Sequence, residues 1–274
     1  MNRTKCMSLI ITSLFFILFL STIQTYSQII LFTNHNPHDS VKISFFSIFK
    51  NTNNVKQKFL KAYNKFIVFA DDKIIKLKTG QSFVWDDGKK KTFDEKCNNA
   101  DLEDMVFQNY FSGKSWKSPP EFEYNPGRIR NENFFKAIYG NSESEVRKNC
   151  VNINWFGRKI PFNNINGGAD SLKAVIKELS LLNKEFRKYF SITTGTLNWR
   201  VIAGTKRLSM HSFALAIDIN NSYSDYWRNS KNVEYKNRIP IEIVEIFERH
   251  GFIWGGKWYN YDTMHFEFRP ELLS

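Results

Sequence analysis

The chain has 274 residues, of which 42% are hydrophobic and 24% are charged, so it carries enough apolar material for a substantial folded core. This composition excludes a disordered chain, and the charge content excludes a protein made of many membrane spans. The 39 Lys and Arg residues exceed the 27 Asp and Glu residues by 12. That excess favours an anionic partner or surface, but the basic residues are scattered and no nucleic-acid-binding motif accompanies them. We therefore expect no binding to nucleic acid.

The N-terminus has the layout of a secretory signal peptide. Arg3 and Lys5 precede an apolar run over residues 7–20, and residues 21–27 are small and polar. Cleavage would fall before Gln28, although weakly polar neighbours could lengthen the run into an uncleaved membrane anchor. The sequence therefore predicts export to the periplasm or cell envelope, with the mature chain either secreted or anchored.

Two cysteines, Cys97 and Cys150, remain outside this segment. In an oxidising compartment they could form a disulfide, but each sits where a buried free thiol would fit. We favour two free thiols. No C-x-x-C motif is present, which argues against zinc or redox chemistry based on cysteine.

In chain order, residues 1–27 are expected to be the signal or anchor, 28–130 an accessory region and 131–274 the catalytic domain. The stretch 28–60 shows little periodicity and is expected to be a loosely packed lead-in. Short apolar runs over 66–85 predict a meander of strands, with a turn at 86–91. The segment 116–130 holds Pro119-Pro120 and Pro126-Gly127 and is expected to be a loop.

The C-terminal half predicts helices flanking a sheet. Apolar residues recur at helical spacing over 170–190, and Pro240 and Gly251 bracket a second helix over 240–250. Strands are expected at 198–202, 213–219 and 263–268. Helices mixed with hairpin-linked strands predict an α+β fold built on an antiparallel sheet.

His211, Asp218 and His265 are candidate metal ligands. Two imidazoles and a carboxylate would leave one position open for water at a catalytic zinc ion, and we expect one ion per chain. His211 and Asp218 are seven residues apart, so a single flat strand would point them to opposite faces. Convergence on one ion therefore requires a bend between them. From spacing alone, a structural histidine satisfied by hydrogen bonds stays an open alternative.

Hydrolysis at such a site needs a base that is not itself a ligand. Asp262 lies three residues before His265 and could reach the water around a bend in the backbone. Glu267 would project from a strand on the same side as His265, where it could orient the imidazole. We therefore favour Asp262 as the base and Glu267 as support.

These residues lie in motifs that resemble the M15 zinc metallopeptidases. The resemblance is carried by the blocks WRVIAGTKRLSMHSFALAIDIN, GFIWGGKW and DTMHFEFRPEL, and more weakly by DLEDMVFQNYF and NPGRIRNENFFKAIYG. The family comprises D-alanyl-D-alanine carboxypeptidases and dipeptidases and the related L-alanyl-D-glutamate endopeptidases, which cut bacterial peptidoglycan peptides. It implies a peptidase domain like that of DD-peptidases and hedgehog proteins.

The resemblance also implies residue roles. His211, Asp218 and His265 match the zinc ligands and Asp262 the catalytic acidic residue, while Arg200 matches the arginine that stabilises the oxyanion of the scissile carbonyl. Binding of substrate or support of the site is expected of Ser209, Trp254 and Trp258, although core packing of the tryptophans is an equal alternative. Ala214 stands where the family usually has glycine, which would cost about 1 kcal/mol if the backbone there needs a positive φ.

The sequence thus predicts an exported D-alanyl-D-alanine carboxypeptidase acting on peptidoglycan peptides. Two alternatives stay open. One is an L-alanyl-D-glutamate endopeptidase, which differs in pocket shape and not in metal chemistry. The other is a zinc-bearing module that binds peptidoglycan without cutting it. The oligomeric state is not predicted.

Overall fold

A computed structural model describes residues 54–229 and 234–273. The chain divides into Met1–Ile43 and Ser44–Ser274, and every described residue belongs to the second unit. The expected signal peptide and most of the lead-in, with His35 and His38, lie outside the described residues. Within the described ranges, no helix combines the length and the apolar character needed to cross a membrane. Export and anchoring therefore stay predictions, as does the domain boundary at residue 130.

The N-terminal part of the described chain is a helix followed by a small sheet. Helix α3 (Asn54–Ala62) precedes strands β1 (Ile67–Ala70), β2 (Ile74–Leu77) and β3 (Ser82–Val84), which form an antiparallel sheet in the order β1-β2-β3. The meander predicted over 66–85 is confirmed. The lead-in prediction is wrong for residues 54–60, because Phe59 of α3 is fully buried and packs against the rings of Trp85 and Phe134.

Three short helices follow, each begun by a side chain that caps its first turn. Helix α4 (Phe93–Asn99) has a capping box at Thr92, and helices α5 (Glu132–Tyr139) and α6 (Glu143–Lys148) start after Asn131 and Ser142. None of these helices is predicted, because at six to eight residues they are too short for a clear apolar period. The loop expected over 116–130 contains no helix or strand, as predicted.

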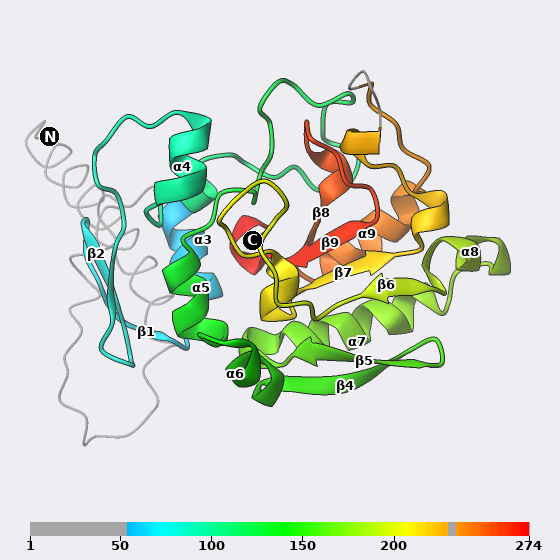
Figure 1. The fold of residues 1–274 in the computed structure, drawn as a ribbon, viewed down its shortest axis with the longest axis horizontal. Coiled ribbons are helices and arrows are strands. Elements are labelled where there is room, and N and C mark those ends of the chain that lie inside the picture. The colour runs from blue at the N-terminus through cyan, green and yellow to red at the C-terminus, as the bar shows by residue number, and fades with distance from the viewer. Residues whose placement is uncertain (1–53, 230–233, 274) are drawn as a thin grey trace, which may run out of the picture. The chain divides into compact units, whose positions relative to one another are not determined.

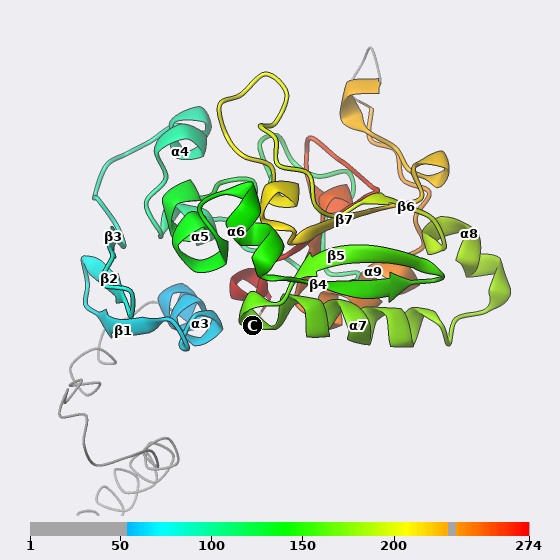
Figure 2. The same ribbon diagram turned by 60° about the horizontal axis from the view of Figure 1, so that its bottom comes forward.

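A hairpin and a long helix form the next layer. Strands β4 (Cys150–Trp155) and β5 (Arg158–Asn163) pair antiparallel, and helix α7 (Gly168–Leu179) lies along them (Figure 2). The helix predicted over 170–190 therefore ends early. Its apolar spacing continues past Leu179 only because a 3-10 turn and the short helix α8 (Arg187–Phe190) follow, with Phe190 again buried.

The central sheet is antiparallel, with strand order β6-β7-β9-β8 (Figure 1). Its strands are β6 (Thr193–Gly195), β7 (Ala216–Ile219), β8 (Phe252–Trp254) and β9 (His265–Phe268). Helix α9 (Ile241–Arg249) packs against β8 and α7, and confirms the helix predicted over 240–250. The mixed fold with antiparallel sheets is confirmed; the narrower likeness to DD-peptidases stays a prediction.

Two strand predictions need correction. No strand forms over 198–202, where Val201 makes a single bridge to Leu208; the edge strand lies earlier, at β6. The segment predicted as a strand from residue 213 starts at Ala216, because Phe213 completes a 3-10 turn and Ala214 reverses the backbone. This reversal supplies the bend that the ligand spacing requires.

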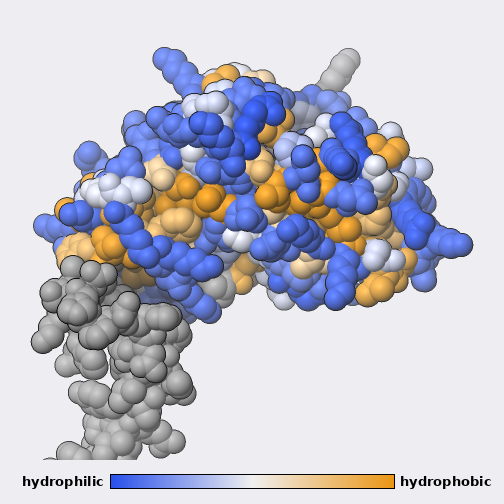
Figure 3. Space-filling model, turned by 90° about the horizontal axis from the view of Figure 1, so that it is seen from below, coloured by the Kyte–Doolittle hydropathy of each residue, from blue (hydrophilic) through white to orange (hydrophobic). Residues whose placement is uncertain are grey.

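One hydrophobic core joins α3, the small sheet, α5, α7, α9 and the central sheet, and it is rich in aromatic rings. From the side of β4, β5 and α7 the surface is mostly hydrophilic, with a band of hydrophobic residues across it (Figure 3). Cys97 and Cys150 are both free; the first is buried and the second half-buried. The free-thiol reading is therefore the one the structure bears out.

Candidate metal centre

The backbone between His211 and Asp218 makes a tight reversal. His211 lies in a 3-10 turn (Met210–Phe213), Ala214 has φ 51° and ψ 39° in the left-handed region, and Asp218 follows on β7. Ser209 begins the turn, since its side chain accepts a hydrogen bond from the backbone N–H of His211 at 3.3 Å. The reversal brings two side chains from opposite faces of an extended chain to one place.

The third side chain comes from the neighbouring strand. Strands β7 and β9 pair so that Asp218 lies directly opposite His265. Opposite residues of an antiparallel pair have their Cβ atoms about 5 Å apart, so their side chains meet on one face of the sheet. Sheet register therefore fixes Asp218 and His265, and the reversal at Ala214 adds His211.

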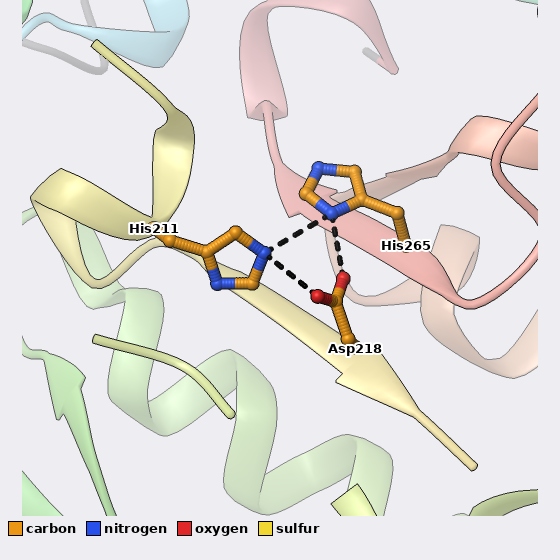
Figure 4. A group of neighbouring side chains, drawn as sticks. All are labelled: His211, Asp218 and His265. Atoms are coloured by element: carbon orange, nitrogen blue, oxygen red, sulfur yellow. Dashed lines mark hydrogen bonds and ion pairs between the residues drawn. The ribbon is translucent and has the colours of Figure 1, made fainter. Parts of the chain in front are cut away.

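Three ligand-type atoms converge in the resulting group (Figure 4). His211 Nε2 lies 3.2 Å from Asp218 Oδ2 and 3.3 Å from His265 Nδ1, and His265 Nδ1 lies 2.8 Å from Asp218 Oδ1. A tetrahedral zinc ion with bonds of about 2.0–2.1 Å separates its ligand atoms by about 3.3 Å. The donor set and spacing of His211, Asp218 and His265 thus fit one zinc ion.

Hydrogen bonds at the far side of each imidazole orient the two rings. His211 Nδ1 lies 2.9 Å from the carbonyl oxygen of Thr196, which can only accept, so this nitrogen carries the proton and Nε2 is free to bind a metal. His265 Nε2 lies 3.0 Å from Glu267 Oε1, which leaves Nδ1 toward the group. Glu267 therefore lies within hydrogen-bond distance of His265, and its supporting role stays a prediction. Thr196 is a supporting residue that sequence reasoning missed.

Attraction between opposite charges holds the three side chains together, against the cost of burying them. Burial opposes the charge on Asp218, but His211 and His265 outweigh it and keep the pKa of this carboxyl well below its usual range. Burial also opposes the charge on His265, yet its hydrogen bonds to Asp218 and Glu267 raise its pKa to about 10. A metal ion would therefore compete with a proton for this site. About 22% of the Asp218 side chain is exposed, so the group is reachable from outside.

Asp262 lies next to this group without belonging to it. It comes just before β9, where its carbonyl accepts from the backbone N–H of His265 and its own N–H donates to the carbonyl of Gly255. Its Oδ1 atom is buried and has no hydrogen-bond partner within the described residues. Burial raises the pKa of Asp262 to about 6, against the opposing charge of His265. A buried, unpaired carboxylate oxygen beside a metal group is the arrangement that a catalytic base needs.

Glu267 is itself held by two arginines. Arg130 Nη1 lies 3.4 Å and Arg269 Nη1 lies 3.5 Å from its carboxylate oxygens. Burial opposes the charge on Glu267, but Arg130, His265 and Arg269 together lower its pKa to about 2. The carboxylate therefore stays ionised as it orients His265.

Arg200 is placed at the surface. Its Nη1 donates to the carbonyl of Val201 at 3.4 Å, and its backbone N–H donates to Ser212 Oγ. In the described part of the chain, none of its hydrogen bonds joins it to the metal group or to Asp262. The oxyanion role of Arg200 stays a prediction from the family resemblance.

The tryptophans named as candidate substrate contacts are buried, with 1% of Trp254 and 2% of Trp258 exposed. Trp254 donates its indole N–H to the carbonyl of Thr263, and Trp258 donates to that of Pro126. The Trp258 ring centroid lies 5.7 Å from that of His265. This placement favours the packing role left open by the sequence, in which the rings support the site from behind.

Arg128 is a second site residue that sequence reasoning missed. Its guanidinium lies 4.2 Å from the centroid of the Trp258 ring, and the Trp258 ring in turn packs against His265. The positive charge of Arg128 also lowers the pKa of Asp262, against the larger effect of burial. In NPGRIRNENFF, Arg128 and Arg130 flank Ile129, which is 2% exposed. Neighbours of a core residue in an extended segment are expected to point away from the core, so this pattern does not predict that both guanidinium groups are buried.

A buried cluster of two histidines and one carboxylate, with a further carboxylate at its side, is an arrangement typical of metal-dependent hydrolases. Comparison with known families narrows this class: residues 203–268 match the M15 peptidase family model described as D-alanyl-D-alanine carboxypeptidase. The match confirms the resemblance to the M15 peptidases and contains all three ligand candidates and Asp262. No curated protein and no solved structure matches the chain.

Proposed function

We propose that the protein is a zinc-dependent, exported peptidase that cuts peptidoglycan stem peptides, acting as a D-alanyl-D-alanine carboxypeptidase. The observation that carries the proposal is the unpaired Oδ1 of Asp262 beside the group of His211, Asp218 and His265. The family match over 203–268 supports the peptidase chemistry and the substrate class. A net charge of +12 is compatible with an anionic envelope polymer as the surrounding surface.

His211 Nε2, His265 Nδ1 and the carboxylate of Asp218 would hold the zinc ion. When bound, zinc lowers the pKa of water and polarises a carbonyl. Asp262 Oδ1 would take the proton that water loses as it attacks the peptide carbonyl, and would return it to the leaving amine. Thr196 and Glu267 keep both imidazoles in the tautomer that this arrangement needs.

Metal analysis and peptide hydrolysis test this proposal together. The purified chain is expected to hold about one zinc ion and to release D-alanine from muropeptides that end in D-Ala-D-Ala, with loss of activity on chelation. Release of fragments from cross-linked or L-alanyl-D-glutamyl substrates instead would favour the endopeptidase. Zinc binding without cleavage of any muropeptide would favour the binding module.

The variant Asp262→Asn separates a peptidase from a binding module. It keeps the size of the side chain but cannot accept a proton, so turnover is expected to fall by about 10²- to 10⁴-fold while zinc content stays unchanged. Glu242→Gln, on the exposed side of α9, is the matched control. Equal turnover in wild type and Asp262→Asn would refute the mechanism.

A further inference from the structure

Three arginines gather beside the metal group and are called here the arginine cluster: Arg128, Arg130 and Arg207. Arg207 Nη1 donates to the carbonyl of Arg128 at 3.3 Å, which joins the 206–208 loop to the chain before α5. Burial, followed by the like charges of Arg269, Arg207 and Arg128, lowers the pKa of Arg130 to about 10 despite Glu267. Positive groups packed this closely repel one another, so the cluster costs free energy unless an anion joins it.

The cluster is short of anionic partners. Arg130 pairs with Glu267 at 3.4 Å, but among the described residues neither Arg128 nor Arg207 has a carboxylate oxygen within ion-pair distance. Both bond to backbone carbonyls instead: Arg128 Nη2 donates to Asn260 at 2.9 Å, and Arg207 to Arg128. The Nε atoms of Arg128 and Arg207 are buried with no hydrogen-bond partner. A buried N–H without a partner is costly, and it indicates a ligand that supplies the acceptor.

A cavity of about 480 Å³ is lined by two members of this cluster, Arg130 and Arg207, while Arg128 lies behind its wall. It lies between the end of α4, the start of α5 and the 206–208 loop, and Arg130, Lys206 and Arg207 contribute to its wall. The one acidic residue in the wall, Glu132, already accepts from the backbone N–H of Leu208 and pairs with Lys136. The remaining polar lining consists of asparagines and the N-terminal turn of α5. The cavity therefore offers an anion several donors and no free negative charge.

The cavity is also next to the metal group. Arg130 lines the cavity and contacts Glu267, and Glu267 accepts from His265. One carboxylate thus separates the cavity wall from a candidate zinc ligand.

We propose that this cavity is a subsite for a carboxylate of the peptide substrate, with Arg207 as its principal donor and Arg128 and Arg130 adding positive charge. A carboxylate supplies the acceptors that a guanidinium fork needs, and such charged hydrogen bonds are stronger than neutral ones. The proposal rests on the proposed peptidase function for the identity of its ligand. The carboxylate can be the C-terminus of the peptide or an acidic side chain next to the scissile bond.

Calorimetry on the full chain tests this subsite, with the Asp262→Asn substitution present to prevent turnover. The probes are acetyl-D-Ala-D-Ala and its C-terminal amide, and a second amidated pair that differs only in one glutamate or glutamine side chain. We expect the acid to bind about 10- to 100-fold more tightly than the amide in at least one pair, and the pair that discriminates identifies the source of the carboxylate. Equal binding within both pairs would overturn the proposal.

The variant Arg207→Gln is expected to abolish this preference, and Arg187→Gln, at an exposed position on α8, is expected to keep it. Survival of the preference in Arg207→Gln would also overturn the proposal. If Arg207→Gln does not fold, thermal unfolding of the otherwise unaltered chain replaces it. In at least one of the two acid–amide pairs, the member with the extra carboxylate should then raise Tm more than its amide, and equal shifts within both pairs would count against the subsite.

The outcomes distinguish a failure of the subsite from a failure of the proposed function. Carboxylate preference without hydrolysis of any peptide by wild type would leave the subsite standing and remove the peptidase. Hydrolysis without carboxylate preference would do the reverse.

Discussion

Among the described residues, three groups of side chains each bring three ligand-type atoms within 4.8 Å of one another, and two of them differ in what neutralises their charge. The first is the metal group of His211, Asp218 and His265. The second joins Asp101, Glu103 and Asp104 near α4. In the second group, Lys91 lies 2.9 Å from Asp101 and 2.7 Å from Asp104, and Lys96 also pairs with Asp104.

The two lysines neutralise the aspartates of the acidic group. Asp101 and Asp104 also accept from backbone N–H groups, including each other's, so their oxygens have partners already. In the metal group the three side chains face one another, and the neighbouring carboxylate of Asp262 keeps an unpaired buried oxygen. Proximity of ligand-type atoms therefore does not by itself indicate a metal site, because ammonium groups can already neutralise such a group, as Lys91 and Lys96 do here.

Removal of a ligand should show the largest contrast between the two groups. His265→Ala deletes one of three ligands, so zinc content should fall close to zero and hydrolysis should fall by at least about 10³-fold. Metal analysis by atomic emission and an assay of released D-alanine measure the two effects. Asp101→Asn is the matched change in the other group and should leave zinc content as it is. If Asp101→Asn lost zinc and His265→Ala kept it, the metal would bind at the acidic group near α4, and the assignment to His211, Asp218 and His265 would be wrong.

Removal of a lysine should have its effect on stability. Lys91 has 7% of its side chain exposed, and Lys91→Met would leave Asp101 and Asp104 buried with less positive charge. Breaking such a buried pair costs about 3 kcal/mol in the free energy of unfolding, measured by urea denaturation, while zinc content should not change. Lys89→Met, which removes an exposed partner of Asp87, should leave stability nearly unchanged. A Lys91→Met chain as stable as wild type would show that the pair contributes little.

The same pair predicts a dependence on pH. Burial opposes the charge on Asp104, but hydrogen bonds from Lys91 and Lys96 outweigh it and lower its pKa. A lowered pKa stabilises the folded chain above the unfolded-state value of about 3.9, and this contribution is lost as pH falls through the folded-state pKa. The deficit of Lys91→Met should therefore be full at pH 6 and shrink below about pH 4. Urea denaturation across this range measures it, and a deficit that grows as pH falls would contradict the assignment.

The sequence could identify the metal group but not the cluster that lies next to it. His211, Asp218 and His265 stand in a dense motif, and their odd spacing required the bend that Ala214 makes. Arg128 and Arg207 are 79 residues apart, and no local pattern indicates that they meet.

The strand misplaced at 198–202 has the same cause, because contacts between distant segments cannot be predicted from a local pattern. Apolar alternation shows that a segment can be extended, but pairing with β7 is decided by register across the sheet, at Thr193 and Gly195.

Weakening the hydrogen bond that supports His265 should reduce zinc binding less than removing His265 itself. Glu267→Gln keeps an acceptor for the imidazole N–H but removes the charge that favours it, so zinc affinity should fall by about 10- to 100-fold. Competition with a chelating dye measures this affinity, with Glu242→Gln on α9 as the control. Affinity unchanged by Glu267→Gln would show that the carboxylate serves only to neutralise Arg130 and Arg269.

The smallest effect is expected at the reversal that brings His211 toward Asp218. Ala214 has φ 51°, a left-handed backbone in which a residue with a Cβ atom is strained by about 1–2 kcal/mol relative to glycine. Ala214→Gly relieves this strain but gives up a buried methyl group and loosens the unfolded chain, so stability should change by less than about 0.5 kcal/mol. Ala216→Gly on β7 has no such strain to relieve and should cost about 1 kcal/mol. Urea denaturation compares the two variants. An equal loss in both would mean that the left-handed backbone at Ala214 carries no strain, and that the bend at the metal group is as comfortable for alanine as the strand that follows it.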